Sequence, residues 1–396
     1  MPTKLQELRD ERQWTQERLL VAIEKCAAQH GVQVAERRSL KVMISRWENG
    51  RGGAMEERYR ALFREVYRTT DEGLGLALAE NLGLPLPSAP ISTRSPSSGP
   101  EATRWLIGLF EQHIQAEPFM GPQLLLPSVQ PQLEIINALA KRTTGQARDD
   151  AYLLGAQFAE FCGWLYQDAG DSESATYWTS QAHDFAQMRG DMWMISYTLM
   201  RKANIAVEDD SPGHGIGLAE AALRVNTPLP PRMRAAALRV KANGAAMLGD
   251  RDEFRRAIEE ASELAWEGAQ DSELDDPARY CTPSYVQMEE ATSLVHLGEP
   301  EAALAIFEHG LEAWPMTQRR DRGLCLARMA TAHAVNRDVD QALAVGSEAS
   351  AIAWETGSVR ITKELQRLRA EVAQHAGSGV ISDLDRAISA PEHGAG

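Results

Sequence analysis

A pattern of small and apolar residues recurs about every forty residues through the larger, C-terminal part of this 396-residue chain. Each copy has a turn position, then a small or apolar residue five places later, with partners four and seven places beyond it. Successive turn positions are 40, 39, 49 and 39 residues apart. Repeats of this length fit two antiparallel helices each, so the pattern predicts an array of helix pairs. The triplets are Ala175, Thr179 and Ala182; Gly215, Ala219 and Ala222 (the weakest); Phe254, Ile258 and Ala261; Ala303, Phe307 and Gly310; Ala342, Gly346 and Ala349.

The position twelve residues before each triplet is also small. Packed helices need a small residue where their backbones cross closely, so this recurrence supports the register. The pattern resembles the tetratricopeptide repeat, in which a small residue sits in the first helix and small residues seven apart in the second. These positions are Gly163, Ala203, Ala242, Ala291 and Ala330.

The chain has no alternating strand patterns, so we expect an all-α fold. A Pro/Ser-rich stretch at 84–101 is typical of a linker. We therefore predict a separate helical module at 1–83, an α-solenoid of tetratricopeptide-like helix pairs at 102–377 and a frayed tail at 378–396.

Charge is unevenly distributed between these parts. The net charge is −15, yet residues 1–76 hold 14 Lys/Arg and 12 Asp/Glu, whereas the remainder holds 27 and 44. The slightly basic N-terminal module can approach a phosphate backbone, while the acidic mass is kept off it. The charge pattern is compatible with DNA binding and does not demonstrate it.

The N-terminal segment has the signals of several short helices. Leu5 and Leu8 begin an amphipathic pattern, and Thr15 is a suitable N-cap for a second helix. A third helix is expected from Ser39 to Gly50, with apolar residues on one face and basic residues on the other. Residues 55–67 predict a fourth helix that closes the core.

This segment resembles the lambda-repressor/Cro-like (XRE) helix-turn-helix family. The resemblance is carried by Leu8-Arg9-x-x-Arg12, by Trp14-Thr15-Gln16-x-x-Leu19 and by the run Ile44–Gly50. One departure is the dozen residues, Ala27–Arg38, that precede the third helix where the family uses a short turn.

The resemblance implies roles for particular residues. Gln16, Asn49 and Arg51 would contact phosphate, and Lys41, Val42, Ser45 and Arg46 would face the major groove. Glu48 is expected to be a structural partner rather than a base reader. The whole architecture resembles a group of actinobacterial regulators and, more distantly, the Rgg/PlcR-type peptide-pheromone receptors, which implies a peptide effector.

In an array of helix pairs the first helices line the inner face. Asn and Thr side chains there could bond a peptide main chain, and arginines could hold a carboxylate. A peptide or small-molecule effector, a protein partner and a purely structural role all remain open for this face. The predicted groove residues are Trp164, Asn204, Arg239, Asn243, Thr292, Arg328 and Thr331.

No catalytic motif or metal-ligand spacing is present, so we expect no enzyme activity, cofactor or metal. The four cysteines have no paired spacing and are expected to be buried, reduced thiols of a cytoplasmic protein. No apolar run reaches the length of a membrane span. The tryptophans at 105, 178, 193, 266, 314 and 354 are expected to be packing residues.

The sequence therefore favours a transcription regulator that binds double-stranded DNA as a homodimer, with the repeat domain sensing an effector. The alternative is a protein-interaction scaffold in which the helix-turn-helix survives only as a fold.

Overall fold

The computed structural model describes residues 3–30, 32, 34–35, 37–49, 55, 57–69, 74, 99–270, 276–312, 314, 318–374 and 378–388. Every regular element within these ranges is an α-helix, as the sequence predicts. The chain divides into two compact units, Met1–Arg94 and Ser95–Gly396, and each is described by itself.

The described residues of the first unit form four helices around one core. Leu19, Leu20 and Ile23 of the second helix, with Tyr59 and Phe63 of the fourth, are almost fully buried because each helix has its apolar residues on one face. The expected N-cap is confirmed: the Arg18 amide donates to Thr15 Oγ1 at 3.1 Å. The helices are α1 (Lys4–Glu11), α2 (Gln16–His30), α3 (Arg37–Glu48) and α4 (Glu57–Tyr67).

The long segment between the second and third helices is divided between helix and connection. α2 continues for 15 residues, and six residues, 31–36, lead to α3. The Ala35 amide donates to the Tyr59 hydroxyl at 3.0 Å, which ties this connection to α4. α3 therefore begins at Arg37, two residues before the predicted start at Ser39, because the basic pair Arg37-Arg38 joins its first turn.

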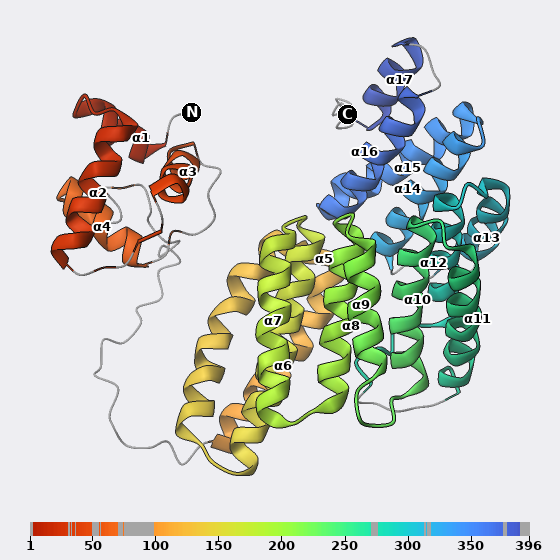
Figure 1. Ribbon diagram of the computed structural model, residues 1–396, viewed down its shortest axis with the longest axis horizontal. Helices are drawn as coiled ribbons and strands as arrows, with labels where there is room; N and C mark the ends of the chain where they lie inside the picture. The colour runs from red at the N-terminus through yellow and green to blue at the C-terminus, as the bar shows by residue number, and fades with distance from the viewer. Residues whose placement is uncertain are drawn as a thin grey trace, which may run out of the picture. The chain divides into compact units, whose positions relative to one another are not determined.

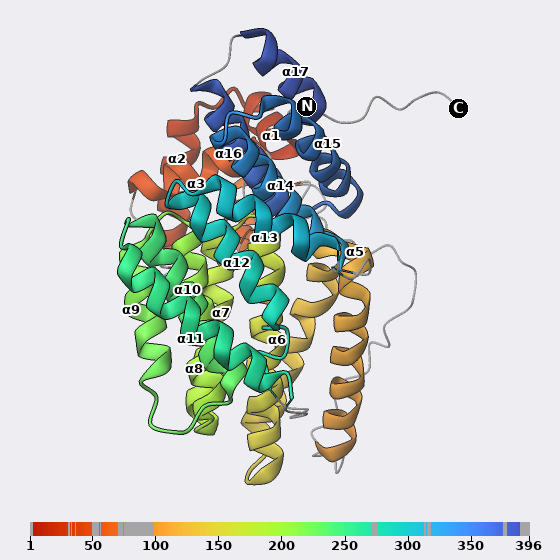
Figure 2. The same cartoon turned by 90° about the vertical axis from the view of Figure 1, so that its right-hand side faces the viewer.

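In its described part, the second unit is a helical-repeat fold in which α5 (Gly99–Arg142), two helices that meet at Gly121, is followed by six helix pairs (Figures 1 and 2). The pairs run from α6–α7 to α16–α17, and the first helix of each pair packs against its own partner and the neighbouring pairs. The helices are α5 (Gly99–Arg142), α6 (Gln146–Asp168), α7 (Ser172–Arg189), α8 (Met192–Glu208), α9 (Pro212–Leu223), α10 (Pro231–Met247), α11 (Arg251–Gly268), α12 (Pro283–His296), α13 (Pro300–Glu312), α14 (Arg319–Val335), α15 (Val339–Thr356), α16 (Val359–Ala373) and α17 (Ser378–Ile388).

Every predicted turn position adopts a left-handed backbone conformation. Gly170, Asp210, Gly249, Gly298 and Arg337 have φ between 54° and 76°, which reverses the chain between the two helices of a pair. The five predicted small positions are all buried, and an added Cβ at the first, Gly163, would lie 2.6 Å from Thr179 Oγ1. The register of the repeats is thus set by close backbone approach.

The two ends of the solenoid contact each other. α16 packs on α6, and α15 packs on α5. A Cβ at Gly170 would meet Val359 Cγ1 at 2.5 Å, and one at Gly121, where α5 kinks, would meet the Thr356 carbonyl oxygen at 2.9 Å. These tight approaches close the helical array into a ring.

Two expectations of packing differ from the structure. Trp105, Trp266 and Trp354 are 56–61% exposed rather than buried, because they lie on helix faces that no later helix covers. The segment expected to be a frayed tail contains α17, whose Leu384 is fully buried and whose Ile388 carbonyl accepts from Ser350 Oγ. All four cysteines are free and buried, as expected.

Candidate functional site

The predicted recognition helix α3 separates a buried side from an exposed side. Leu40, Ile44 and Glu48 are at most 1% exposed. Lys41, Val42, Arg46 and Asn49 are exposed and Ser45 is partly exposed, so these predicted groove and phosphate contacts project from the unit. An exposed apolar side chain such as Val42, flanked by polar and basic ones, is suited to contact a thymine methyl group.

Glu48 anchors the C-terminal end of α3 inside the unit. Its carboxylate accepts from Arg9 Nε at 2.5 Å and from Gln16 Nε2 at 2.7 Å, and its main-chain carbonyl accepts from Thr3 Oγ1 at 2.6 Å. Three segments of the chain are therefore joined at one buried carboxylate. Glu48 is a structural partner, as the sequence indicates, and Gln16 takes part in holding it.

The basic residues of the α3 face differ in their surroundings. Lys41 lies 3.2 Å from Glu17 of α2, and Arg37 pairs with both Glu17 and Glu24. Arg46 forms no ion pair with the residues that the structure describes. Asn49 donates to the Ser45 carbonyl at 2.6 Å. Arg51, a predicted phosphate contact, lies outside the described residues.

In the second unit, the predicted groove residues lie on the first helices of successive pairs, and four of them join one buried network. Arg239 of α10 donates to Asn204 of α8 at 2.9 Å and to Glu289 of α12 at 3.2 Å. Arg328 of α14 donates to the other oxygen of Glu289 at 2.9 Å and to Thr292 at 3.3 Å. Both arginines are therefore neutralised within the protein, rather than free to hold a ligand carboxylate.

This network continues to the last helix pair and returns to α8. Arg328 Nε lies 3.5 Å from Glu364 of α16. From the same helix, Arg360 donates to Glu208 of α8 at 2.8 Å, and Glu208 also accepts from Asn204 at 3.2 Å. The polar contacts thus form a closed circuit through α8, α10, α12, α14 and α16, which fills the inner face with the protein's own side chains.

Trp164 of α6 lies between two arginines. The guanidinium of Arg360 is 5.0 Å and that of Arg201 5.4 Å from its ring centroids, and the indole N–H donates to Glu117 at 3.2 Å. Cation–π contacts of this kind, when partly desolvated, stabilise arginine side chains in the interior. Trp164 is therefore a packing platform for the network.

Two predicted groove residues lie apart from the network. Thr331 bonds only its own helix, donating to Ala327 at 3.2 Å, and the buried Asn243 Oδ1 has no hydrogen-bond partner among the described residues. The sequence analysis did not name several members of the network, which pair with residues of other helices. The missed residues are Gln167, Arg201, Glu208, Glu289, Arg360 and Glu364.

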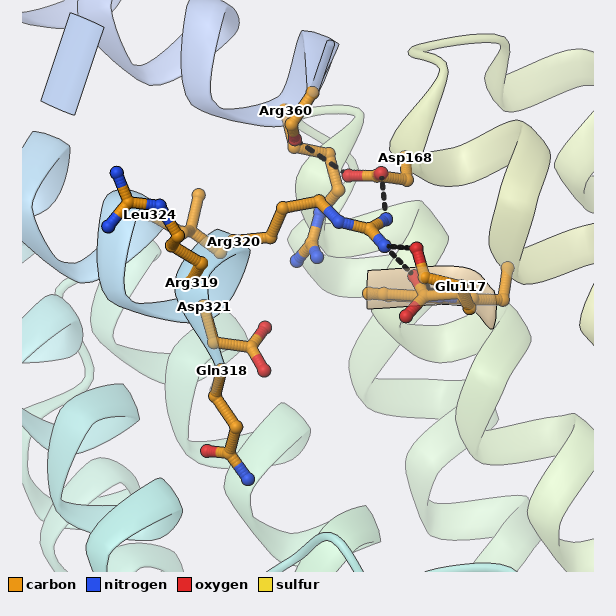
Figure 3. Close-up of a pocket in the computed structure, with 10 residues that line it drawn as sticks. Glu117, Asp168, Gln318, Arg319, Arg320, Asp321, Leu324 and Arg360 are labelled. Carbon is orange, nitrogen blue, oxygen red and sulfur yellow. Dashed lines mark hydrogen bonds and ion pairs between the residues drawn. The ribbon is translucent and has the colours of Figure 1, made fainter. Parts of the chain in front are cut away.

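A cavity of about 130 Å³ lies at the seam where the two ends of the solenoid meet (Figure 3). Figure 3 shows the Arg320 guanidinium between Asp168 and Glu117. The guanidinium nitrogens lie 2.7 Å from an Asp168 carboxylate oxygen and 2.6 Å from a Glu117 carboxylate oxygen. Ser358 also donates to Asp168 at 2.7 Å. The cavity is lined by Glu117, Trp164, Asp168, Gln318, Arg319, Arg320, Asp321, Leu324, Ser358 and Arg360.

Burial and nearby positive charge shift the pKa values of the carboxyl groups of this region in opposite directions. Burial raises the pKa of Glu117 and of Asp321, and nearby arginines only partly offset it. Burial would also raise the pKa of Glu208, but Arg360 and the Gln167 hydrogen bond outweigh it and lower that pKa to about 2. Negative charge is therefore well compensated at Glu208 and Glu289 of the network and poorly compensated at Glu117 and Asp321 of the seam.

Among the described residues, no cluster of three or more His, Cys, Asp or Glu side chains could hold a metal ion. No helix in the described part of the chain has the length and apolarity to span a membrane.

Comparison with known proteins adds a distant structural likeness. Neither a known family model nor a curated protein matches this sequence. Among solved structures, the chain is similar to a Rap protein in complex with competence and sporulation factor, with 13% identity and a TM-score of 0.48. The match covers 73% of this chain and 85% of the other. This likeness is too distant to assign a site, so the sites described above rest on the contacts of this chain's own residues.

Proposed function

We propose that this chain is a non-enzymatic, sequence-specific DNA-binding regulator of the XRE type whose helical-repeat unit binds an effector. The observation that carries the proposal is the arrangement of α3. Its inner side is held by the apolar core and by the Glu48 contacts, and its outer side presents Lys41, Val42 and Arg46. A helix with a fixed inner side and a polar, basic outer side is suited to enter a major groove.

In this proposal Arg46 supplies base recognition. It is exposed and pairs with none of the described residues, so its guanidinium can reach the O6 and N7 atoms of a guanine. Asn49 and Arg51 contact phosphate and set the register of the helix on the duplex. Gln16 has a second role beside phosphate contact, because it also positions Glu48.

The test is selection of bound duplexes from a random pool with the full chain, followed by fluorescence anisotropy at several salt concentrations. We expect binding that weakens steeply with salt. Arg46→Ala should lose about 1–3 kcal/mol on the selected site and little on random DNA. Arg224→Ala, an exposed arginine of the other unit, is the matched control. Absence of any enriched sequence, or equal losses from the two variants, would refute the proposal.

We also propose that the regulator acts as a homodimer, because one module of this size reads few bases. Two copies would contact half-sites about 34 Å apart. Light scattering of the full chain bound to the selected duplex should give two chains per duplex, and the selected sequence should be an inverted repeat. A single chain on a single half-site would exclude this arrangement.

A scaffold function is the alternative, and one observation favours it. Glu17 and Glu24 pair with Arg37 and Lys41, which places negative charge beside the α3 face. A scaffold predicts a stable protein partner and no response of that complex to Lys41→Glu or Arg46→Glu. A regulator predicts that the same charge reversals abolish DNA binding.

A further inference from the structure

The charges around the seam cavity do not balance, whereas those of the neighbouring network do. In the network, Arg201, Arg239, Arg328 and Arg360 match Glu160, Glu289, Glu364 and Glu208. At the cavity, Glu117, Asp168 and Asp321 face the guanidinium groups of Arg320 and Arg360, and Arg360 is shared with Glu208. Arg319 is paired with Glu355, which does not line the cavity.

Asp321 is the group that this imbalance leaves without a partner. Glu117 accepts from Arg320 and from Trp164, and Asp168 accepts from Arg320 and from Ser358. The Asp321 carboxylate lines the cavity but forms no hydrogen bond or ion pair with any described residue, and Figure 3 draws none to the other lining side chains. A partly buried carboxylate without a partner is unfavourable unless a donor reaches it.

We infer that the seam cavity is a binding site for one cationic group, an ammonium or a guanidinium, which is held by Asp321 and Glu117. This inference rests on the effector-binding role proposed above for the repeat unit. The cavity is large enough for such a group and reaches the surface at Gln318, which is exposed. The net negative charge of the second unit attracts cations toward it.

The bound cation competes directly with the contact that closes the ring. Arg320 holds Glu117 on α5 and Asp168 on α6, and so links α14 to the first helices of the unit. A second cation beside Glu117 satisfies that carboxylate and weakens its attraction for Arg320. Occupation of the cavity is therefore coupled to the stability of the contact between the two ends of the solenoid.

The same chemistry is offered by a small amine and by a basic residue of a peptide. Isothermal titration of the full chain with methylguanidinium chloride and with acetyl-Ala-Arg-Ala-amide, using acetyl-Ala-Gln-Ala-amide as the neutral control, distinguishes the two sources. We expect at least one cationic probe to bind with one-to-one stoichiometry and the neutral peptide to show no heat. Tighter binding of the peptide assigns a peptide source; equal binding assigns a small cation.

Asp321→Asn should weaken binding of the cationic probe at least tenfold. Asp340→Asn, the same change in the exposed first turn of α15, should leave binding within twofold. Circular dichroism and thermal melting without probe establish that Asp321→Asn folds, and we expect its Tm to equal or exceed that of the wild type. Lack of binding by either cation at 10 mM, or equal affinities for Asp321→Asn and the wild type, would overturn the inference.

DNA binding is measured separately, on the selected duplex without any cation. A chain that binds no DNA but binds the cation through Asp321 would refute the regulator proposal and leave this inference standing. A chain that binds DNA but neither cationic probe would support the regulator proposal and refute the cation site. That outcome would indicate that burial keeps Asp321 or Glu117 protonated and uncharged.

Discussion

The Arg320 guanidinium donates to Asp168 at 2.7 Å across 152 residues of sequence. The side chains are 10% and 3% exposed, so this ion pair lies in the interior of the seam. It joins the start of the fifth helix pair to the end of α6, which is the first helix of the first pair. This buried ion pair is one of the contacts that hold the two ends of the solenoid together, and its contribution can be measured.

Arg320→Ala should therefore destabilise the second unit by about 3 kcal/mol, because it leaves Asp168 and Glu117 buried without their shared cation. We expect amide hydrogen exchange to rise most in α16 and the C-terminal half of α6. Arg319→Ala removes the neighbouring arginine, whose pair with Glu355 is exposed, and should cost under about 1 kcal/mol. Equal effects of the two variants in urea unfolding would show that the seam pair does not hold the ring.

The repeat register was predictable because it depends on local geometry. Gly163 and Ala203 recur at fixed spacing since only small residues permit the close helix crossing, and Gly249 marks a turn that needs positive φ. The inner network was not predictable, because its pairs between helices join residues 34 to 152 positions apart, as Arg201 with Gln167 and Arg360 with Glu208. Such pairs follow no helical period.

The difference between local periodicity and tertiary packing also explains why the burial of the tryptophans and the pairing of the groove residues were not predicted. A tryptophan in a helix of an array can lie on a face toward the next pair or on an outer face, and hydrophobicity alone does not separate them. Arg239 and Arg328 were expected on the inner side, and their common partner Glu289 was not foreseen. Position on a face follows from periodicity, whereas the pairing of charges follows from tertiary packing.

Arg337→Gly should stabilise the second unit. Arg337 occupies the left-handed turn between α14 and α15 with φ 65°, where the other strong repeats have glycine. A residue with a Cβ is disfavoured in this conformation by roughly 1 kcal/mol, and the exposed side chain of Arg337 contributes little stabilisation. Chemical denaturation should show a gain of about 0.5–1 kcal/mol, and Gly249→Ala a loss of similar size. A loss on Arg337→Gly would mean that backbone entropy outweighs the relief of strain.

The contribution of Glu208 should disappear in acid. Its pKa in the folded chain is about 2, below its ordinary value, so the folded state binds fewer protons at this group than the unfolded state. Its stabilising contribution is therefore complete above about pH 5 and is lost as the pH falls toward 2. The difference in Tm between the wild type and Glu208→Gln should be large at pH 7 and shrink steadily from pH 5 to pH 3. A difference that is constant over this range would contradict the assignment.

Glu17→Gln should strengthen DNA binding. Glu17 accepts from both Arg37 and Lys41, and these contacts lower its pKa, so it is a negative charge beside the proposed DNA-binding face at neutral pH. Its removal frees Lys41 for phosphate, leaves Arg37 paired only with Glu24 and removes one repulsion, which should improve affinity about threefold, and more at low salt, where screening is weaker. Because the pairs are exposed, Tm should change little. Glu259→Gln, an exposed glutamate of α11, carries the same change in net charge and should leave affinity unaltered. If both variants improve affinity equally, net charge alone acts on DNA; if Glu17→Gln weakens it, the pairs with Glu17 hold α3 in its binding orientation.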